Sequence, residues 1–350
     1  MDDIDWRVLK TSQAWLAQGR QPVLVTVART WGSSPRPPGA MMVIDSGGRT
    51  VGSVSGGCIE DDLIAHLRQG GPTTLCPDGR PVVLRYGIDA DTAHRFGLPC
   101  GGTIELVLEP LGPASRLDDL LTALQARQVT ERVLDLASGT VTLQPAPQDA
   151  LPTLDARQLR TIVGPRYRLL VIGAGDLSQY LCATALGLGF DITVCDPRPE
   201  QRDTWQLDGV RFLTDMPDDA VQAVRPDART AVVALTHDPK LDDLALLEAL
   251  NTDAFYIGAI GSRRNQQLRH ARLIEHFEQT EDSLARLRGP IGIYIGSKTP
   301  AEIAVSVMAE VLAVKNGVPL PRDLAVGPAK DQLDVAPNAP SMVCFMREDP

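Results

Sequence analysis

Residues 168–196 read RLLVIGAGDLSQYLCATALGLGFDITVCD and decide the fold of the C-terminal half. After its arginine, the run 168–172 is continuously apolar, as in a parallel strand that is buried on both faces. A glycine turn follows, and residues 179–188 then carry a helical pattern that ends at Gly189. Residues 192–196 are predicted to form the next strand. The order strand, helix, strand predicts a βαβ unit, and apolar runs at 231–235 and 255–259 extend the parallel sheet.

The turn inside this unit matches the phosphate-binding pattern Gly-x-Gly-x-x-Gly, with serine at the third position. Gly173 permits the sharp turn, and Gly175 lets a pyrophosphate approach the start of the helix. Asp196 follows the second strand about twenty residues on, where an acid binds ribose hydroxyls. We therefore predict a Rossmann-like, doubly wound parallel sheet with Gly173, Gly175 and Asp196 as cofactor contacts. Asp176 is unexpected, because a carboxylate in the turn repels phosphate.

A second glycine turn of this half carries two arginines where a helix is predicted to begin. Cations at that position oppose the positive end of the helix dipole, and a bound anion would relieve the conflict. The alternative is that both guanidinium groups extend into solvent. The candidate anion contacts are Gly261, Ser262, Arg263 and Arg264. Thr299 and Glu302, by contrast, frame a capping box, which is a structural signal.

The N-terminal half follows a different pattern, in which short strands succeed one another and predict an α+β domain. Its most informative blocks are GSSPRPPGAMMVI at 32–44 and GSVSGGCIE at 52–60. Glycines let the backbone approach a ligand and serines add hydroxyl donors, so these turns suit a phosphate or a polar ring. Two ordinary loops around a hairpin are the alternative. The candidate cofactor contacts are Ser33, Ser34, Arg36, Gly39, Ser55, Gly56, Gly57, Cys58, Glu60, Cys100, Gly101 and Gly102.

None of the six cysteines forms a C-x-x-C pair or lies at zinc-site spacing from a histidine, so free thiols are expected. Cys58 and Cys100 each adjoin paired glycines at a turn, where an accessible thiol can contact a metal or exchange sulfur. Cys182 and Cys195 lie in apolar runs and are expected to be buried. Glu60 is a candidate acid or ligand to a polar ring, or simply a charge at the start of a helix.

Composition narrows the class of protein further. The net charge of −10 argues against non-specific binding to nucleic acid or to an anionic membrane surface. No apolar run of membrane-spanning length and no signal-peptide pattern are recognisable, so a cytoplasmic protein is expected. The patterns predict an N-terminal domain at 1–112, a connecting segment at 113–165, a Rossmann-like domain at 166–327 and a tail at 328–350.

Taken together, these motifs resemble the XdhC/CoxI family of accessory factors for xanthine dehydrogenase and related molybdenum hydroxylases. The matching stretches are both N-terminal blocks, CGG at 100–102, VIGAG at 171–175, CDPR at 195–198 and YIGAIGSRR at 256–264. The family turn usually reads Gly-Ala-Gly-His, and Asp176 departs from it.

The resemblance implies a chaperone rather than an enzyme. Such proteins bind the molybdenum cofactor, as molybdopterin or its cytosine dinucleotide, protect it during sulfuration and insert it into the apo-hydroxylase. A cysteine desulfurase supplies the sulfur, and the chain is a candidate homodimer. Two alternatives stay open: an NAD(P)-dependent oxidoreductase, which the Rossmann half alone suggests, and an assembly factor that grips the apo-hydroxylase without binding the cofactor.

Overall fold

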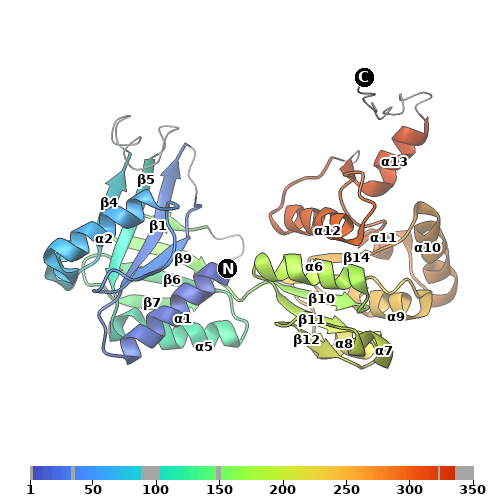
Figure 1. Ribbon diagram of the computed structural model, residues 1–350, viewed down its shortest axis with the longest axis horizontal. Coiled ribbons are helices and arrows are strands. Elements are labelled where there is room, and N and C mark those ends of the chain that lie inside the picture. Colours follow the sequence, from blue (N-terminus) through green and yellow to red (C-terminus); the bar gives the residue numbers. More distant parts are fainter. Residues whose placement is uncertain (1–2, 33–35, 88–102, 147–150, 322–323, 336–350) are drawn as a thin grey trace, which may run out of the picture. The chain divides into compact units, whose positions relative to one another are not determined.

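The computed structural model describes residues 3–32, 36–87, 103–146, 151–321 and 324–335. The chain divides into two compact units, Met1–Arg166 and Tyr167–Pro350, each with its own sheets and core (Figure 1). The first unit contains antiparallel sheets and the second a parallel sheet, so each unit is described by itself.

The larger sheet of the first unit is antiparallel and has the strand order β3-β2-β1-β5-β4. One face packs against Ile59, Leu63 and Leu67 of α2, and the other packs against α1 and α5. This mixture of antiparallel strands and covering helices confirms the α+β prediction. The elements are α1 (Asp3–Ala17), β1 (Val23–Trp31), β2 (Met41–Ile44), β3 (Thr50–Gly52), α2 (Cys58–Gly70), α3 (Pro72–Leu75), β4 (Val82–Tyr86) and β5 (Thr103–Pro110).

A second antiparallel sheet, of order β7-β6-β9-β8, comes from residues that the sequence assigned to a connecting segment. It shares a core with the first sheet, because Leu134 and Leu159 pack against Ala28 and Val107. Residues 113–165 therefore belong to the first unit rather than to a separate connecting segment, and the second unit begins at Tyr167, next to the predicted start at residue 166. The elements are α5 (Leu117–Gln125), β6 (Thr130–Asp135), β7 (Val141–Pro145), β8 (Thr153–Leu154) and β9 (Gln158–Val163).

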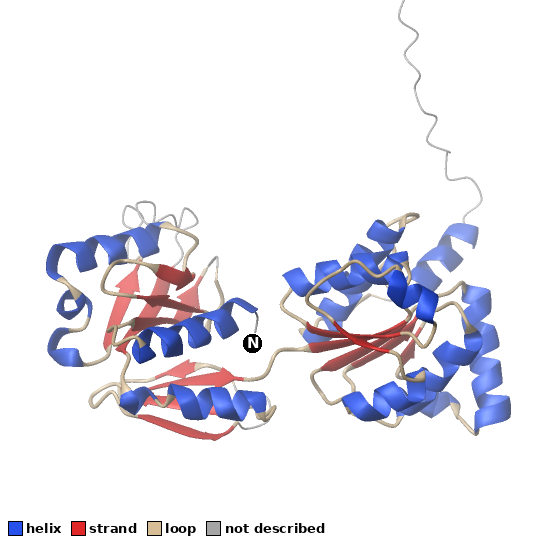
Figure 2. Cartoon of the chain, turned by 60° about the horizontal axis from the view of Figure 1, so that its bottom comes forward, coloured by secondary structure: helices blue, strands red, loops and turns tan. Residues whose placement is uncertain are grey.

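The second unit is the predicted doubly wound domain, with a parallel sheet of order β12-β11-β10-β13-β14-β15. Helices α6 and α12 cover one face, and α8, α9 and α10 cover the other (Figure 2). The elements are β10 (Arg168–Ile172), α6 (Asp176–Gly187), β11 (Asp191–Cys195), α7 (Pro199–Asp203), β12 (Arg211–Leu213), α8 (Pro217–Val224), β13 (Thr230–Ala234), α9 (Pro239–Leu250), β14 (Tyr256–Ala259), α10 (Arg263–Phe277), α11 (Glu281–Leu284), β15 (Leu287–Arg288), α12 (Pro300–Lys315) and α13 (Val326–Val335).

The central strands of this sheet are buried on both faces, which explains their continuous apolar sequences. The predicted capping box is confirmed, because Thr299 accepts from the amide of Glu302 and Glu302 accepts from the amide of Thr299. Among the described helices, none has the length and apolar character needed to cross a bilayer.

Candidate functional site

The N-terminal glycine loop is organised by one buried carboxylate, that of Glu60. This side chain lies in the first turn of α2 and folds back toward residues 53–57. Its oxygens accept hydrogen bonds from the backbone amides of residues 54–57 at 2.8 to 3.3 Å. They also accept from the hydroxyls of Ser53, at 2.7 Å, and Ser55. The loop amides that the sequence predicted to face a ligand are thus turned toward an internal anion.

The hydrogen bonds keep this carboxylate ionised. Burial opposes the charge, but the donors of Ser55 and Ser53 outweigh it and lower the pKa of Glu60 to about 2. The residue is 8% exposed. Glu60 therefore holds the loop that leads into Cys58, the first residue of α2, and the predicted direct contact of its carboxylate with a ligand is replaced here by internal ones.

The remaining N-terminal candidates divide by location. Gly39 lies just before β2 with φ at +92°, a conformation that favours glycine. Arg36 is partly buried and lies 4.0 Å from the carboxylate of Asp5. The candidates Ser33, Ser34, Cys100, Gly101 and Gly102 fall outside the described residues.

In the second unit, the predicted nucleotide turn lies at the carboxyl edge of the sheet, where the strand order reverses between β10 and β13. Ligands of open α/β sheets bind at such a switch point. The segment after β13 packs closely against the turn: a Cβ atom at Gly173 would lie 2.9 Å from the amide nitrogen of Thr236. Asp176, the first residue of α6, lines a separate hollow of about 600 Å³ beside the start of α12.

We expect Gly173→Ala to destabilise the second unit by about 1–3 kcal/mol, because φ is +104° there and the new methyl group meets Thr236. Gly175→Ala is the matched control, since φ is −78° and nothing lies within 4 Å of its built Cβ. Chemical denaturation of both variants checks the difference. Equal loss of stability in the two would contradict the close packing assigned to Gly173.

Asp196 is placed as predicted, directly after β11, but its bonding differs from the prediction. It is completely buried and accepts from the amide of Ala174 at 2.9 Å and from three donors of Arg198 at 2.8 to 3.0 Å. Burial opposes its charge, yet the bonds from Arg198 and Ala174 lower the pKa of Asp196 below its usual value. Four donors fill the acceptor positions of a carboxylate. The predicted ribose contact is thus replaced by an internal clamp that holds Arg198 beside the glycine turn.

The second glycine turn is also confirmed as a helix start. Ser262 is the N-cap of α10 and accepts from the amide of Asn265 at 3.1 Å. Arg263 forms an ion pair with Asp331 of α13, with 2.5 Å between Nη1 and Oδ1. The two arginines border a hollow of about 540 Å³.

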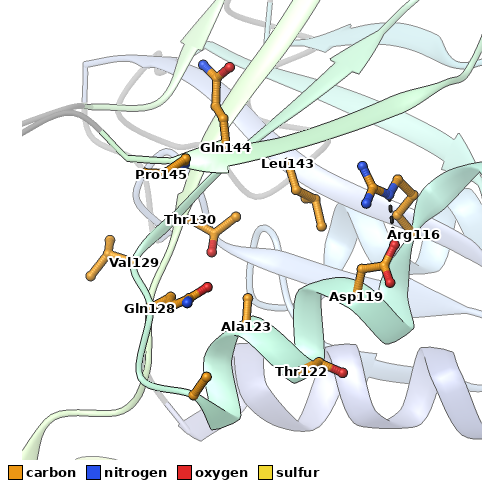
Figure 3. A pocket seen from close by; sticks show the side chains of 11 residues that line it. Arg116, Asp119, Thr122, Ala123, Gln128, Val129, Thr130, Leu143, Gln144 and Pro145 are labelled. Atoms are coloured by element: carbon orange, nitrogen blue, oxygen red, sulfur yellow. Dashed lines mark hydrogen bonds and ion pairs between the residues drawn. The ribbon is translucent and has the colours of Figure 1, made fainter.

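A further hollow was not anticipated from the sequence. It measures about 710 Å³ and lies in the first unit between α5 and strands β6 and β7, where Arg116 pairs with Asp119 at its rim (Figure 3). None of the candidate site residues lines it. Its walls come from α5, β6 and β7, which pack together only in the folded unit. No short sequence motif therefore predicts this hollow.

The described cysteine side chains support a structural role. Cys76, Cys182 and Cys195 are free and buried, and burial raises the pKa of each thiol to about 12. The burial predicted for Cys182 and Cys195 is thus confirmed. Among the residues that the structure describes, no group of three or more His, Cys, Asp or Glu side chains is arranged to hold a metal ion.

Comparisons with known proteins identify relatives of both units. The family model described as the XdhC and CoxI family matches residues 15–87, and the XdhC Rossmann domain matches residues 169–311. The chain is 29% identical over 308 residues to "Molybdenum cofactor insertion chaperone PaoD" of Escherichia coli, with 88% of each chain covered. It is 26% identical over 335 residues to a protein of Bacillus subtilis named as a probable xanthine dehydrogenase subunit, covering 87% of this chain and 96% of that protein.

A solved structure shares the fold. A crystal structure titled as a xanthine dehydrogenase from Bacillus halodurans aligns with a TM-score of 0.70 and 24% identity, covering 91% of this chain and 96% of that one. At this identity the likeness supports the architecture alone.

Proposed function

Because models of the XdhC and CoxI family match residues 15–87 and 169–311 of this chain, we propose that it binds the molybdenum cofactor as cargo and inserts it into an apo molybdenum hydroxylase. The observation that carries the proposal is the similarity, over 88% of both chains, to a protein named as a molybdenum cofactor insertion chaperone. The role is binding and delivery rather than catalysis. Its finer steps are protection of the cofactor, exchange of an oxo ligand for sulfide with sulfur from a cysteine desulfurase, and transfer to a xanthine dehydrogenase-type client.

The first unit offers the features that suit the molybdenum end of the cargo. Glu60 fixes residues 53–57, and these lead directly into Cys58 at the start of α2. Thiolates are soft ligands of the kind that bind late or sulfur-rich metal centres. We propose that Cys58 and Cys100 contact molybdenum or its sulfur, with the serines and glycines of the two N-terminal blocks around the pterin. Molybdopterin and its cytosine dinucleotide both remain candidate forms, in a cytoplasmic monomer or homodimer.

Titration with isolated molybdenum cofactor tests this proposal. We expect saturable binding, and we expect Cys58→Ala or Cys100→Ala to weaken it by at least about tenfold, as for loss of a charge-assisted contact. Cys182→Ala is the matched control, because that thiol is buried in the core of the second unit. Isothermal titration measures affinity, and activation of the apo-hydroxylase measures delivery. Unchanged affinity and activation in both variants would remove the thiols from the site.

Two other measurements separate the alternatives: thermal shift with NAD, and capture of the apo-hydroxylase. NAD should not raise the melting temperature, because the acceptor positions of Asp196 are already filled by Ala174 and Arg198. Strong stabilisation by NAD with no response to the molybdenum cofactor would instead favour an oxidoreductase. Capture of the apo-hydroxylase with a yield independent of the cofactor would favour a cofactor-free assembly factor.

A further inference from the structure

A hollow of about 540 Å³ lies in the second unit, beside the start of α10 and the residues that follow strands β14 and β15 of the parallel sheet. Three segments far apart in the sequence enclose it: the first turn of α10, the residues that follow β15, and α13. Its lining residues include Arg263, Arg264, Gln266, Gly289, Pro290 and Asp331.

The part of the hollow that α10 contributes carries positive charge with no acidic residue of the same helix turn to balance it. The first turn of α10, a helix of 15 residues, contains two arginines and no acid. The amino end of a helix already carries partial positive charge, so these guanidinium groups add repulsion. Arg264 makes no ion pair or hydrogen bond with the residues that the structure describes. The arrangement favours an anion between the two arginines.

A carboxylate already occupies part of this position. Asp331, which lies 68 residues further along the chain, places Oδ1 at 2.5 Å from Nη1 of Arg263. The Asp331 side chain is 67% exposed and that of Arg263 is 34% exposed. Ion pairs this exposed contribute little to stability, so a stronger anion can replace the carboxylate. Phosphate is such an anion, because its oxygens accept paired hydrogen bonds from guanidinium groups.

We propose that this hollow binds a phosphate group through Arg263 and Arg264, and that Asp331 occupies Arg263 until phosphate replaces it. The exchange is non-covalent: one anion leaves the guanidinium as another arrives. The C-terminal helix α13 is thereby a strap whose contact is released when the site fills. That the phosphate belongs to the molybdenum cofactor rests on the proposed function, whereas the site itself does not.

The test uses inorganic phosphate with the full chain, in chloride buffer at constant ionic strength, without the cofactor. We expect saturable stabilisation of the wild type in a thermal-shift titration. Arg263→Ala should weaken phosphate binding by at least about tenfold, and Arg264→Ala should also weaken it. Asp331→Asn should strengthen it by about twofold to fivefold, because the competing carboxylate is gone.

Asp282→Asn is the matched control, because it removes one negative charge from an exposed position on α11. It should leave the affinity unchanged if displacement is local. AMP and adenosine form a second comparison: AMP should bind and adenosine should not. Absence of phosphate stabilisation in both the wild type and Asp331→Asn would overturn the site, and unchanged or weaker binding by Asp331→Asn would overturn the displacement. Cofactor binding that survives Arg263→Ala would leave the proposed function standing and assign the phosphate to another compound.

Discussion

Replacing Glu60 by glutamine is expected to lower the free energy of unfolding of the first unit by about 2–3 kcal/mol. The carboxylate accepts from the loop amides of residues 54–57 and from two serine hydroxyls, and an amide side chain cannot accept at its nitrogen. Donors left facing that nitrogen lose their partners while buried, which costs about 1–3 kcal/mol per group at most. Urea denaturation followed by far-ultraviolet circular dichroism measures the loss.

Asp61→Asn supplies the control for Glu60→Gln. Asp61 is the next residue of α2, is exposed, and also carries a negative charge in the first turn. Its substitution removes a similar interaction with the helix dipole, worth about 0.3–1 kcal/mol. If both variants lost the same stability, the loop hydrogen bonds assigned to Glu60 would contribute nothing beyond its charge.

The same carboxylate makes the stability of the first unit depend on pH. The pKa of Glu60 is about 2 in the folded chain, against 4.5 for a free glutamate side chain. Because the folded pKa is depressed, the contribution is fully present above about pH 5 and is lost as the pH falls toward 2. A shift of this size corresponds to at most about 3 kcal/mol. Denaturation curves of the wild type and Glu60→Gln should converge toward pH 2, and parallel curves would contradict the assignment.

Arg132→Met is expected to have the largest effect on stability, about 3–5 kcal/mol. Arg132 on β6 donates to Glu109 on β5 at 2.6 Å, and the two side chains are 4% and 3% exposed. Removing the guanidinium leaves a buried carboxylate without its charge partner. The pair joins the two sheets of the first unit, so both sheets should lose protection together in hydrogen exchange.

Two further variants separate the charge effect from packing. The double substitution Arg132→Met with Glu109→Leu should recover much of the loss, because no unpaired charge remains. Arg157→Met is the exposed control: that side chain is 80% exposed, pairs with Asp135 at 3.2 Å, and should change stability by less than about 1 kcal/mol. Loss of protection confined to β6–β9 in Arg132→Met would show that residues 113–165 unfold separately from the larger sheet.

These predictions also bear on the proposed cargo site. Both regions expected to present open backbone amides contain an internal carboxylate instead: Glu60 in the N-terminal loop and Asp196 beside the nucleotide turn. Glu60 fixes residues 53–57, and Asp196 fixes Arg198 beside the glycine turn. We therefore expect these acids to act as positioning residues, so that their neutral variants weaken cofactor binding through disorder of the loop rather than through loss of a direct contact.

Much of the local structure could be predicted from sequence because its causes are local. The apolar run 168–172, the glycine turn after it and the capping box at Thr299 each involve residues within a few positions of one another. The two internal acids also had a local signal: Glu60 stands three residues after the N-cap Gly57, and Asp196 stands two residues before Arg198. The sequence shows these spacings. It does not show whether each carboxylate accepts hydrogen bonds from its own chain or contacts a ligand.

By itself, the sequence determined the parallel sheet, the glycine turns, the long helices and the resemblance to the XdhC and CoxI family, since each depends on periodicity or on short spacings along the chain. Only the tertiary structure decided that strands β6, β7, β8 and β9 build a second sheet in the first unit, that Arg132 meets Glu109, and that Asp331 reaches Arg263. The physical reason is that these contacts join elements distant in the chain, and their geometry follows from the packing of several faces at once.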